Sequence, residues 1–270
     1  MRTLSFAHTS VGACLPAGRV AASSAATREW AWGDGSGAGA RVCVLDSGVD
    51  PGHPLVGPLA GSFAAFDDGG RWSVRADDSG DPAGHGTACA SIIRSLAPHC
   101  ELTSVRILGS DNRGSSAGLL SGLAWAVEQR FQLISVSLST RHRPVKEALH
   151  DLSDRAYFEG VTIVSSAHNS PVHSYPWRFS SVISVGSHSL GGPERIETNP
   201  SPPVEFFGAG ARIRVAWPGG GTRVVSGNSF ATPHITGMCA RILGRHPRFR
   251  TTQLRHALSL ISDNLEGASR

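Results

Sequence analysis

Short, largely apolar runs that stop abruptly at polar residues constrain the fold of this chain most. Residues 42–45 read Val-Cys-Val-Leu and run into Asp46, and residues 161–164 read Val-Thr-Ile-Val and run into two serines. Short runs without alternation are typical of strands buried on both faces, as in parallel sheets covered by helices. Strand-like runs alternate with helix-like segments along the chain, so we expect an α/β fold with a mainly parallel sheet covered on both sides.

The length of the chain fits one domain of this kind. With 270 residues, 40% of them hydrophobic, it can bury one large core, and it contains no internal repeat or low-complexity block. We expect the domain to cover residues 29–266. Residues 1–28 are rich in Ala, Ser and Gly, which favours a flexible extension. A short inhibitory peptide or a contact with a partner stays open for this segment.

Three residues in a fixed order define a candidate nucleophilic site. Asp46 closes the first strand, His85 lies in a Gly-His-Gly-Thr motif, and Ser229 lies in a Gly-Asn-Ser-Phe-Ala motif. A serine hydroxyl needs a base within hydrogen-bond reach, and histidine, with a pKa of about 6.5, suits that role. A buried carboxylate behind the histidine fixes its tautomer and stabilises the imidazolium. We therefore hypothesise that Asp46 orients, His85 moves protons and Ser229 attacks.

Each of the three residues also has a structural explanation when it is taken alone. Asp46 fits a turn former, His85 a loop histidine and Ser229 a helix N-cap. The chain order decides between these interpretations. The α/β-hydrolases carry Ser, acid and His in that order around a G-x-S-x-G elbow, whereas subtilisin carries Asp, His and Ser. This chain has the second order, and the segment around Ser229 lacks the second elbow glycine, so the hydrolase alternative is excluded.

Together the three motifs resemble the active site of the subtilisin-like serine peptidases (subtilases, peptidase family S8). The resemblance covers about residues 30–265 and implies a three-layer fold with a mainly parallel twisted sheet, and a serine endopeptidase that works through an acyl-enzyme. It also implies that Asn169 matches the Asn whose side chain donates to the oxyanion, with the Ser229 backbone N–H as its partner. Without the triad, Asn169 before Ser170 and Pro171 would fit a turn.

The resemblance further implies which residues line the substrate cleft. Two of them depart from the family pattern, because Ser139 and His168 stand where the family commonly has glycine. We therefore expect a reshaped pocket for the residue that precedes the scissile bond. The expected lining residues are Ser137, Leu138, Ser139, Ser166, Ala167 and His168.

No metal or other cofactor is expected. The segment 92–102 is short where secreted subtilisins carry a calcium-binding loop, and Asp77, Asp78 and Asp81 lie among Gly and Ser residues that favour a solvated turn. Cys89 lies four residues after His85, so the two share a face if a helix begins there. The proteinase K branch of the family also places a cysteine here, and we interpret Cys89 as a small core residue. A zinc site formed by His85, Cys89, His99 and Cys100 would take the base away from the serine and is not expected.

Charge and cysteine usage indicate partners and location. The net charge of +4 is scattered and carried almost entirely by Arg, so we predict no nucleic-acid partner, and no apolar run approaches a membrane span. The N-terminus lacks the continuous apolar stretch of a secretory signal, and the five cysteines are odd in number. We expect a cytoplasmic protein with reduced thiols. The sequence makes no prediction of oligomeric state.

These expectations lead to a functional hypothesis with two alternatives. A broad protease would damage its host, so we favour an endopeptidase of narrow specificity that processes a peptide or protein precursor. A peptide ligase or macrocyclase would share the same acyl-enzyme. A non-catalytic peptide-binding homologue is the third class, which Ala88, Ser139 and His168 make conceivable.

Overall fold

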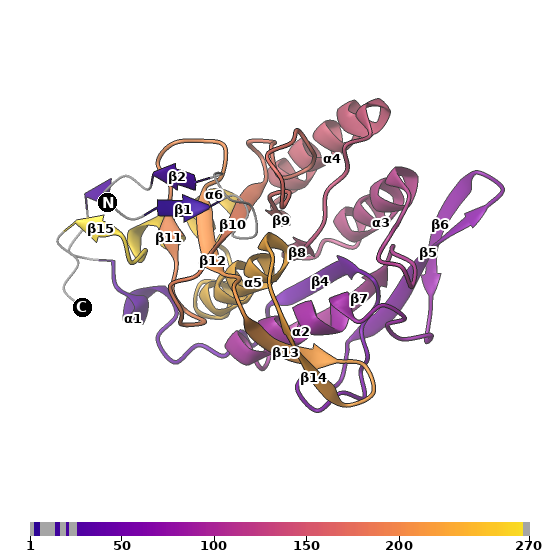
Figure 1. The fold of residues 1–270 in the computed structure, drawn as a ribbon, viewed down its shortest axis with the longest axis horizontal. Helices are drawn as coiled ribbons and strands as arrows, with labels where there is room; N and C mark the ends of the chain where they lie inside the picture. The colour runs from indigo at the N-terminus through magenta and orange to yellow at the C-terminus, as the bar shows by residue number, and fades with distance from the viewer. Residues whose placement is uncertain (1–2, 6–13, 17–19, 22–25, 267–270) are drawn as a thin grey trace.

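The computed structural model describes residues 3–5, 14–16, 20–21 and 26–266. One large sheet crosses the molecule (Figure 1), and its strands follow the spatial order β11 (Glu197–Thr198), β12 (Phe206–Ala209), β10 (Ile183–His188), β9 (Thr162–Ser166), β8 (Leu133–Val136), β4 (Arg41–Asp46), β7 (Glu101–Arg106), β5 (Gly61–Asp68) and β6 (Arg71–Ala76). Neighbours from β12 to β5 are parallel, and the edge strands β11 and β6 are antiparallel to theirs. The mainly parallel sheet predicted from the sequence is confirmed.

Helices cover both faces of this sheet and form the outer layers of a three-layer fold. One core joins the sheet to α2 (His85–Leu96), α5 (Asn228–Arg245) and α6 (Thr251–Leu260). The other joins it to α3 (Ser116–Glu128) and α4 (Lys146–Glu159), which follows the short 3-10 helix η1 (Arg143–Val145). In Figure 1, α2 and α5 lie side by side and pack against each other.

Strand β4 shows why an apolar run without alternation folds here. Val42 and Val44 point into the core shared with α2 and α5, whereas Cys43 and Leu45 point into the core shared with α3 and α4. Both faces of the strand are therefore buried, as a central parallel strand requires. Asp46, its last residue, comes where the strand leaves the sheet.

Smaller elements complete the fold. The hairpin of β13 (Ile213–Trp217) and β14 (Gly221–Val225) packs on α2 through Val215. Short N-terminal strands β1 (Thr3–Ser5) and β2 (Cys14–Pro16) join the large sheet beside β10, and β3 (Val20–Ala21) pairs with β15 (Leu265–Glu266). The first helix is α1 (Arg28–Ala31). Much of the predicted extension at residues 1–28 lies outside the described residues, so its flexibility and the domain boundary at residue 29 stay predictions.

The parallel strands end at one edge of the sheet, and this edge positions the site. Asp46 ends β4 and Ser166 ends the nearby strand β9, after which the chain continues to Asn169. Ligands of open parallel sheets bind outside the carboxyl ends of the strands. Among the described residues, no helix is long and apolar enough to cross a membrane.

Candidate active site

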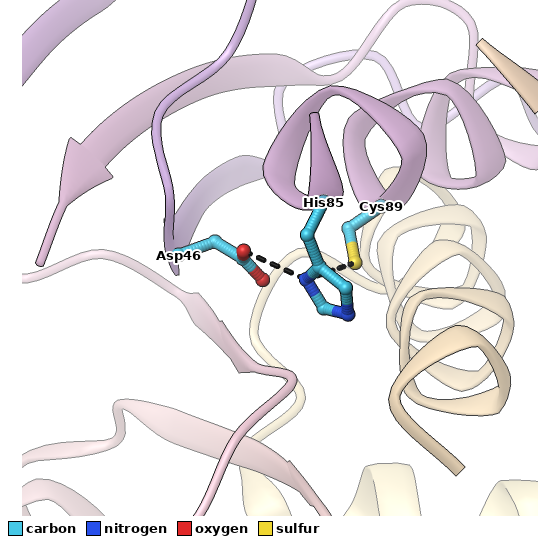
Figure 2. Close-up of side chains that lie close together, drawn as sticks. All are labelled: Asp46, His85 and Cys89. Atoms are coloured by element: carbon cyan, nitrogen blue, oxygen red, sulfur yellow. Dashed lines mark hydrogen bonds and ion pairs between the residues drawn. The ribbon is translucent and has the colours of Figure 1, made fainter. Parts of the chain in front are cut away.

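Asp46 and His85 form a close pair between the end of β4 and the start of α2. Figure 2 shows the imidazole facing the carboxylate. The distance between His85 Nδ1 and Asp46 Oδ1 is 2.8 Å. The Ser47 backbone N–H donates to the same oxygen, also at 2.8 Å. A carboxylate can only accept, so this contact assigns the proton to Nδ1 and leaves the Nε2 lone pair free in the neutral ring. The side chain of Asp46 is 1% exposed and that of His85 14%, which leaves a small part of the imidazole open to a ligand.

The surroundings of His85 change its pKa in opposite directions. Burial lowers the pKa, whereas the charge of Asp46 and the hydrogen bonds that the ring makes with Asp46 and Cys89 raise it, with the net result well above the ordinary value. Within the described chain, Asp46 Oδ2 is buried and has no hydrogen-bond partner, so the charge of this carboxylate acts chiefly on the imidazole.

Cys89 lies one helical turn after His85, on the same face of α2, as the spacing predicts. Its Sγ is 3.8 Å from His85 Nδ1 and 3.7 Å from the Ser229 carbonyl oxygen. Pro233 explains the second contact, because it lacks the N–H that would otherwise bond the carbonyl four residues earlier. Burial raises the pKa of the Cys89 thiol, so it is neutral at physiological pH. Cys89 thus packs beneath the histidine and links α2 to α5.

The metal-ligating residues considered in the sequence are not brought together. His99 and Cys100 follow the far end of the 12-residue α2, and such a helix is about 18 Å long. Ligand atoms of Asp46, His85 and Cys89 lie within 4.8 Å of one another, but the Asp46 and His85 atoms already bond each other. This cluster is therefore an acid–base pair with a thiol beside it.

Ser229 is the second residue of α5 and lies next to this pair. The Phe230 ring packs against the His85 ring with centroids 4.9 Å apart, and Cys89 contacts the Ser229 carbonyl. Ser229 is half-buried. Within the described residues no hydrogen bond joins His85 Nε2 to Ser229 Oγ; catalytic hydrogen bonds without substrate are often long and tighten in the complex. The three predicted residues therefore gather at the meeting point of two helix N-termini.

Asn169 stands on the other side of Ser229. Its Oδ1 accepts the Asn228 backbone N–H at 2.9 Å. This contact fixes the orientation of the side-chain amide and leaves Nδ2 able to donate to a ligand. Gly227 has φ +154°, and a Cβ there would lie 3.3 Å from Ser229 Oγ and 3.5 Å from Asn169 Nδ2. The missing side chain of Gly227 thus leaves a small space flanked by a hydroxyl and an amide donor. A developing oxyanion needs such a space.

Asn228 is a site residue that the sequence analysis missed. Its buried amide accepts from Ser187 N–H and Oγ–H at 3.0 and 2.7 Å, and donates to the carbonyls of Ala167 and His168, both at 3.3 Å. It therefore fastens the loop that carries Asn169 to the start of α5. Its place beside the serine in the Gly-Asn-Ser motif is the only signal that pointed to it.

Leu138 and Ser139, two of the expected cleft residues, line one pocket of the described chain. A pocket of about 320 Å³ lies between the end of β7, the start of α3 and the end of β8, with Leu138 and Ser139 among its walls. Ser137, Ser166 and Ala167 are buried at strand ends. His168 is half-buried, and its Nδ1 accepts the Ser170 N–H at 2.9 Å. Their contacts with substrate stay predictions.

The interpretation of the acidic segment as a solvated turn is wrong for Asp81. Asp78 is exposed and Asp77 pairs with Arg106 at 3.1 Å, but Asp81 is only 8% exposed. The loop folds back over the N-terminus of α2, where backbone N–H groups lack helical partners and attract a carboxylate. Among the described side chains, Cys43, Cys89, Cys100 and Cys239 are buried free thiols, as expected for reduced core residues.

A carboxylate–imidazole pair beside a serine at a helix N-terminus, at the carboxyl edge of a parallel sheet, is typical of serine hydrolases built on an α/β fold. The comparisons with known proteins are more specific. The profile of the Subtilase family, Peptidase_S8, matches residues 37–268. The chain belongs to this family, and it is a serine endopeptidase of the hydrolase class.

Its similarity to individual members is moderate but extends along most of the chain. Subtilisin DY of Bacillus licheniformis is 27% identical over 244 residues, 85% of either chain. Subtilisin-like protease 4 of Trichophyton rubrum is 29% identical, over 84% of this chain and 58% of that protein. The crystal structure of a cold adapted subtilisin-like serine proteinase superposes with a TM-score of 0.68 at 27% identity, covering 86% of this chain and 87% of that one. The predicted family and fold are thereby confirmed.

Proposed function

We propose that Asp46, His85 and Ser229 act as a catalytic triad that hydrolyses peptide bonds through an acyl-enzyme. The single observation that carries this proposal is the buried 2.8 Å contact between Asp46 Oδ1 and His85 Nδ1, which leaves Nε2 basic beside Ser229. The space beside Gly227, between Ser229 Oγ and Asn169 Nδ2, supports Asn169 and the Ser229 N–H as oxyanion donors.

The proposed reaction follows from these positions. Ser229 Oγ attacks the carbonyl carbon while His85 Nε2 takes its proton, and Asp46 stabilises the imidazolium that forms. The carbonyl oxygen takes the negative charge and accepts from Asn169 and the Ser229 N–H. The imidazolium returns its proton to the leaving amine, and the acyl group remains on Ser229. Water then attacks the acyl carbonyl while His85 Nε2 takes its proton, and His85 returns a proton to Ser229 Oγ as the carboxylic acid leaves.

The proposed substrate is a peptide or protein precursor cleaved at few sites. Ser139 lines the pocket beside Leu138, at a position where a glycine would leave more room for substrate backbone. His168 adds a ring next to Asn169. These side chains restrict which residues can approach Ser229, which supports narrow specificity. The buried free thiols support the accompanying proposal of a cytoplasmic location.

Active-site labelling tests the chemistry. A fluorophosphonate probe should label the wild type covalently, and Ser229→Ala should abolish labelling while its circular dichroism spectrum stays unchanged. A well-folded wild type that takes no label would contradict the triad. It would favour the non-catalytic peptide-binding alternative.

A cleavage profile tests the substrate. Incubation with a peptide library should give a few related cleavage motifs by mass spectrometry. Rapid cleavage of unfolded casein at many unrelated sequences would contradict narrow specificity. Products in which a peptide amine rather than water has captured the acyl group would point to a ligase.

A further inference from the structure

Asp81 is the most heavily hydrogen-bonded buried carboxylate near the candidate site, and no role has yet been assigned to it. It lies in the loop before α2, four residues ahead of His85. Its two oxygens accept five hydrogen bonds: Oδ1 from the Ser47 hydroxyl (2.8 Å), the Gly84 N–H (2.7 Å) and the Ala83 N–H (3.1 Å), and Oδ2 from the Thr87 N–H (2.8 Å) and the Thr87 hydroxyl (2.6 Å).

The partners of Asp81 belong to the two segments that carry the acid and the base. Ser47 directly follows Asp46, and its Oγ also accepts the Gly86 N–H at 2.9 Å. Thr87 lies two residues after His85, and its Oγ also accepts the Asp50 N–H at 3.0 Å. Each hydroxyl therefore joins the loop after β4 to the first turn of α2, and Asp81 accepts from both hydroxyls.

Two glycines show how closely these segments approach. A Cβ on Gly86 would lie 2.0 Å from the Gly48 carbonyl oxygen, and a Cβ on Gly48 would lie 2.1 Å from the Gly80 carbonyl oxygen. Gly48 also has φ +102°, which favours glycine. The backbones of the loop after β4, the acidic segment and the start of α2 therefore pack directly on one another, and the hydrogen bonds of Asp81 join these segments.

We propose that Asp81 is a positioning residue for the triad, which holds the loop after Asp46 against the first turn of α2 and so sets the separation of Asp46 Oδ1 and His85 Nδ1. This inference rests on the proposed function. Gly84, the N-cap of α2, has no side chain, so Asp81 supplies the capping acceptors from outside the helix. Its negative charge also complements the helix dipole.

The groups around His85 make its pKa sensitive to this separation. Asp46 from β4 and Cys89 from α2 are its titratable contacts, and the Cys89 thiol is neutral. From α5 come Ser229 and the Phe230 ring, and the β13–β14 hairpin carries Arg223, which stacks on Trp217. Because the charge and hydrogen bond of Asp46 raise the pKa of His85, a longer Asp46–His85 contact lowers it.

Asp81→Asn tests the role of this carboxylate. The amide replaces one acceptor oxygen by a donor, so part of the network is lost. We expect kcat on a cleaved peptide to fall by roughly 10²-fold, the effect of a catalytic group displaced by about 1 Å, with KM little changed. The acid limb of kcat/KM against pH should move to lower pH. Asp78→Asn makes the same charge change at an exposed position of the same loop and should leave kcat and the limb unaltered.

Ser47→Ala is the second variant, used if Asp81→Asn does not fold. It removes one hydroxyl that bridges Asp81 and Gly86 and should shift kcat and the acid limb in the same direction by less. A lower Tm with unchanged kcat and unchanged limb in the folded variants would overturn the inference and leave Asp81 a purely structural residue.

A histidine NMR titration separates this inference from the proposed function. The His85 signal is assigned with His85→Gln, and its pKa should be lower in Asp81→Asn or Ser47→Ala than in the wild type. An unlabelled, inactive wild type whose His85 pKa still falls in these variants would contradict the proposed triad alone. An active wild type whose variants keep the wild-type His85 pKa would contradict the positioning role alone.

Discussion

Helices α2 and α5 both begin at the candidate site, but the backbone N–H groups of their first turns have different hydrogen-bond acceptors. At α2, the first N–H groups are taken by Asp81 and the Ser47 hydroxyl. At α5, Asn169 takes the Asn228 N–H, and within the described chain the Ser229 N–H has no hydrogen-bond acceptor. The N-terminus of α2 is therefore capped by side chains, which hold His85 in place. The N-terminus of α5 keeps a donor free for a ligand, which is where a helix N-terminus stabilises negative charge.

Each of the two helices also carries a histidine, His85 largely enclosed and His234 fully buried, and the two rings differ in their contact partner. His85 faces the carboxylate of Asp46, whereas His234 Nδ1 contacts the Phe230 carbonyl oxygen at 2.8 Å inside α5. Burial lowers the pKa of both rings, but only His85 has a negative charge that overrides it. Burial alone therefore lowers the pKa of a histidine and keeps its ring neutral, whereas burial beside a carboxylate raises the pKa and makes the ring a stronger base.

Removal of the Asp46 carboxylate should have the largest effect on activity, because it removes the difference between the two histidines. In Asp46→Asn the ring loses its charge partner, and the amide can donate to Nδ1, which moves the ring proton to Nε2. We expect kcat to fall roughly 10⁴-fold, as in the equivalent change in chymotrypsin-like enzymes, and the acid limb of kcat/KM to move to lower pH. Steady-state kinetics across pH check this, with the exposed Asp151→Asn on α4 as the charge control. Activity within tenfold of the wild type would show that Asp46 does not act on His85.

The open end of α5 is tested by Asn169→Asp. The new carboxylate still accepts the Asn228 N–H and suits a helix N-terminus, but it offers no donor and repels an oxyanion. We expect kcat to fall by about 10²- to 10³-fold, the range measured for the matching residue of subtilisin, while Tm does not fall.

Asn169→Ala provides the matched comparison, because it removes the donor and the cap together. It should lose similar activity and also lower Tm. Equal kcat for Asn169→Asp and the wild type would mean that Asn169 serves α5 as a cap and not the reaction.

How much of this site the sequence predicts depends on the range of the interactions. The strand that ends at Asp46 and the shared face of His85 and Cys89 follow from local patterns, and both are found. The apolar stretch at residues 131–138 is longer than the strand that it contains, because β8 covers only Leu133–Val136, the part that pairs with β4 and β9. Local patterns therefore locate elements better than they locate the ends of elements.

The residues that the sequence analysis misjudged or missed act over long separations. Asp81 reads as a turn residue between Gly80 and Pro82, yet its Ser47 partner lies 34 residues earlier. Asn228 bonds Ser187, 41 residues away, and a carbonyl 61 residues away. No local pattern encodes such partners, since they are brought together only when the sheet and both helices are packed. The polar residues that hold the site together are thus harder to predict than the residues that react.

The smallest expected effect concerns stability and the histidine of α5. Burial lowers the pKa of His234 to about 4, with His188 adding to the shift. Between that value and the unfolded pKa of about 6.5, the unfolded chain binds a proton that the folded chain does not, so stability falls as pH falls, by about 2 kcal/mol at pH 5. His85 has the opposite sign: its raised pKa contributes stability that is complete below about pH 6.5 and is lost as pH rises through the folded value.

Urea unfolding in a Ser229→Ala background, which prevents self-cleavage, tests the effect of His234. Between pH 7 and pH 5, the free energy of unfolding should fall by about 2 kcal/mol less in His234→Gln than in its parent. The exposed His150→Gln on α4 should lose as much as the parent. Equal losses of unfolding free energy for His234→Gln and the parent would mean that His234 is protonated within the folded protein. The difference between His85 and His234 would then not come from the groups that their rings contact.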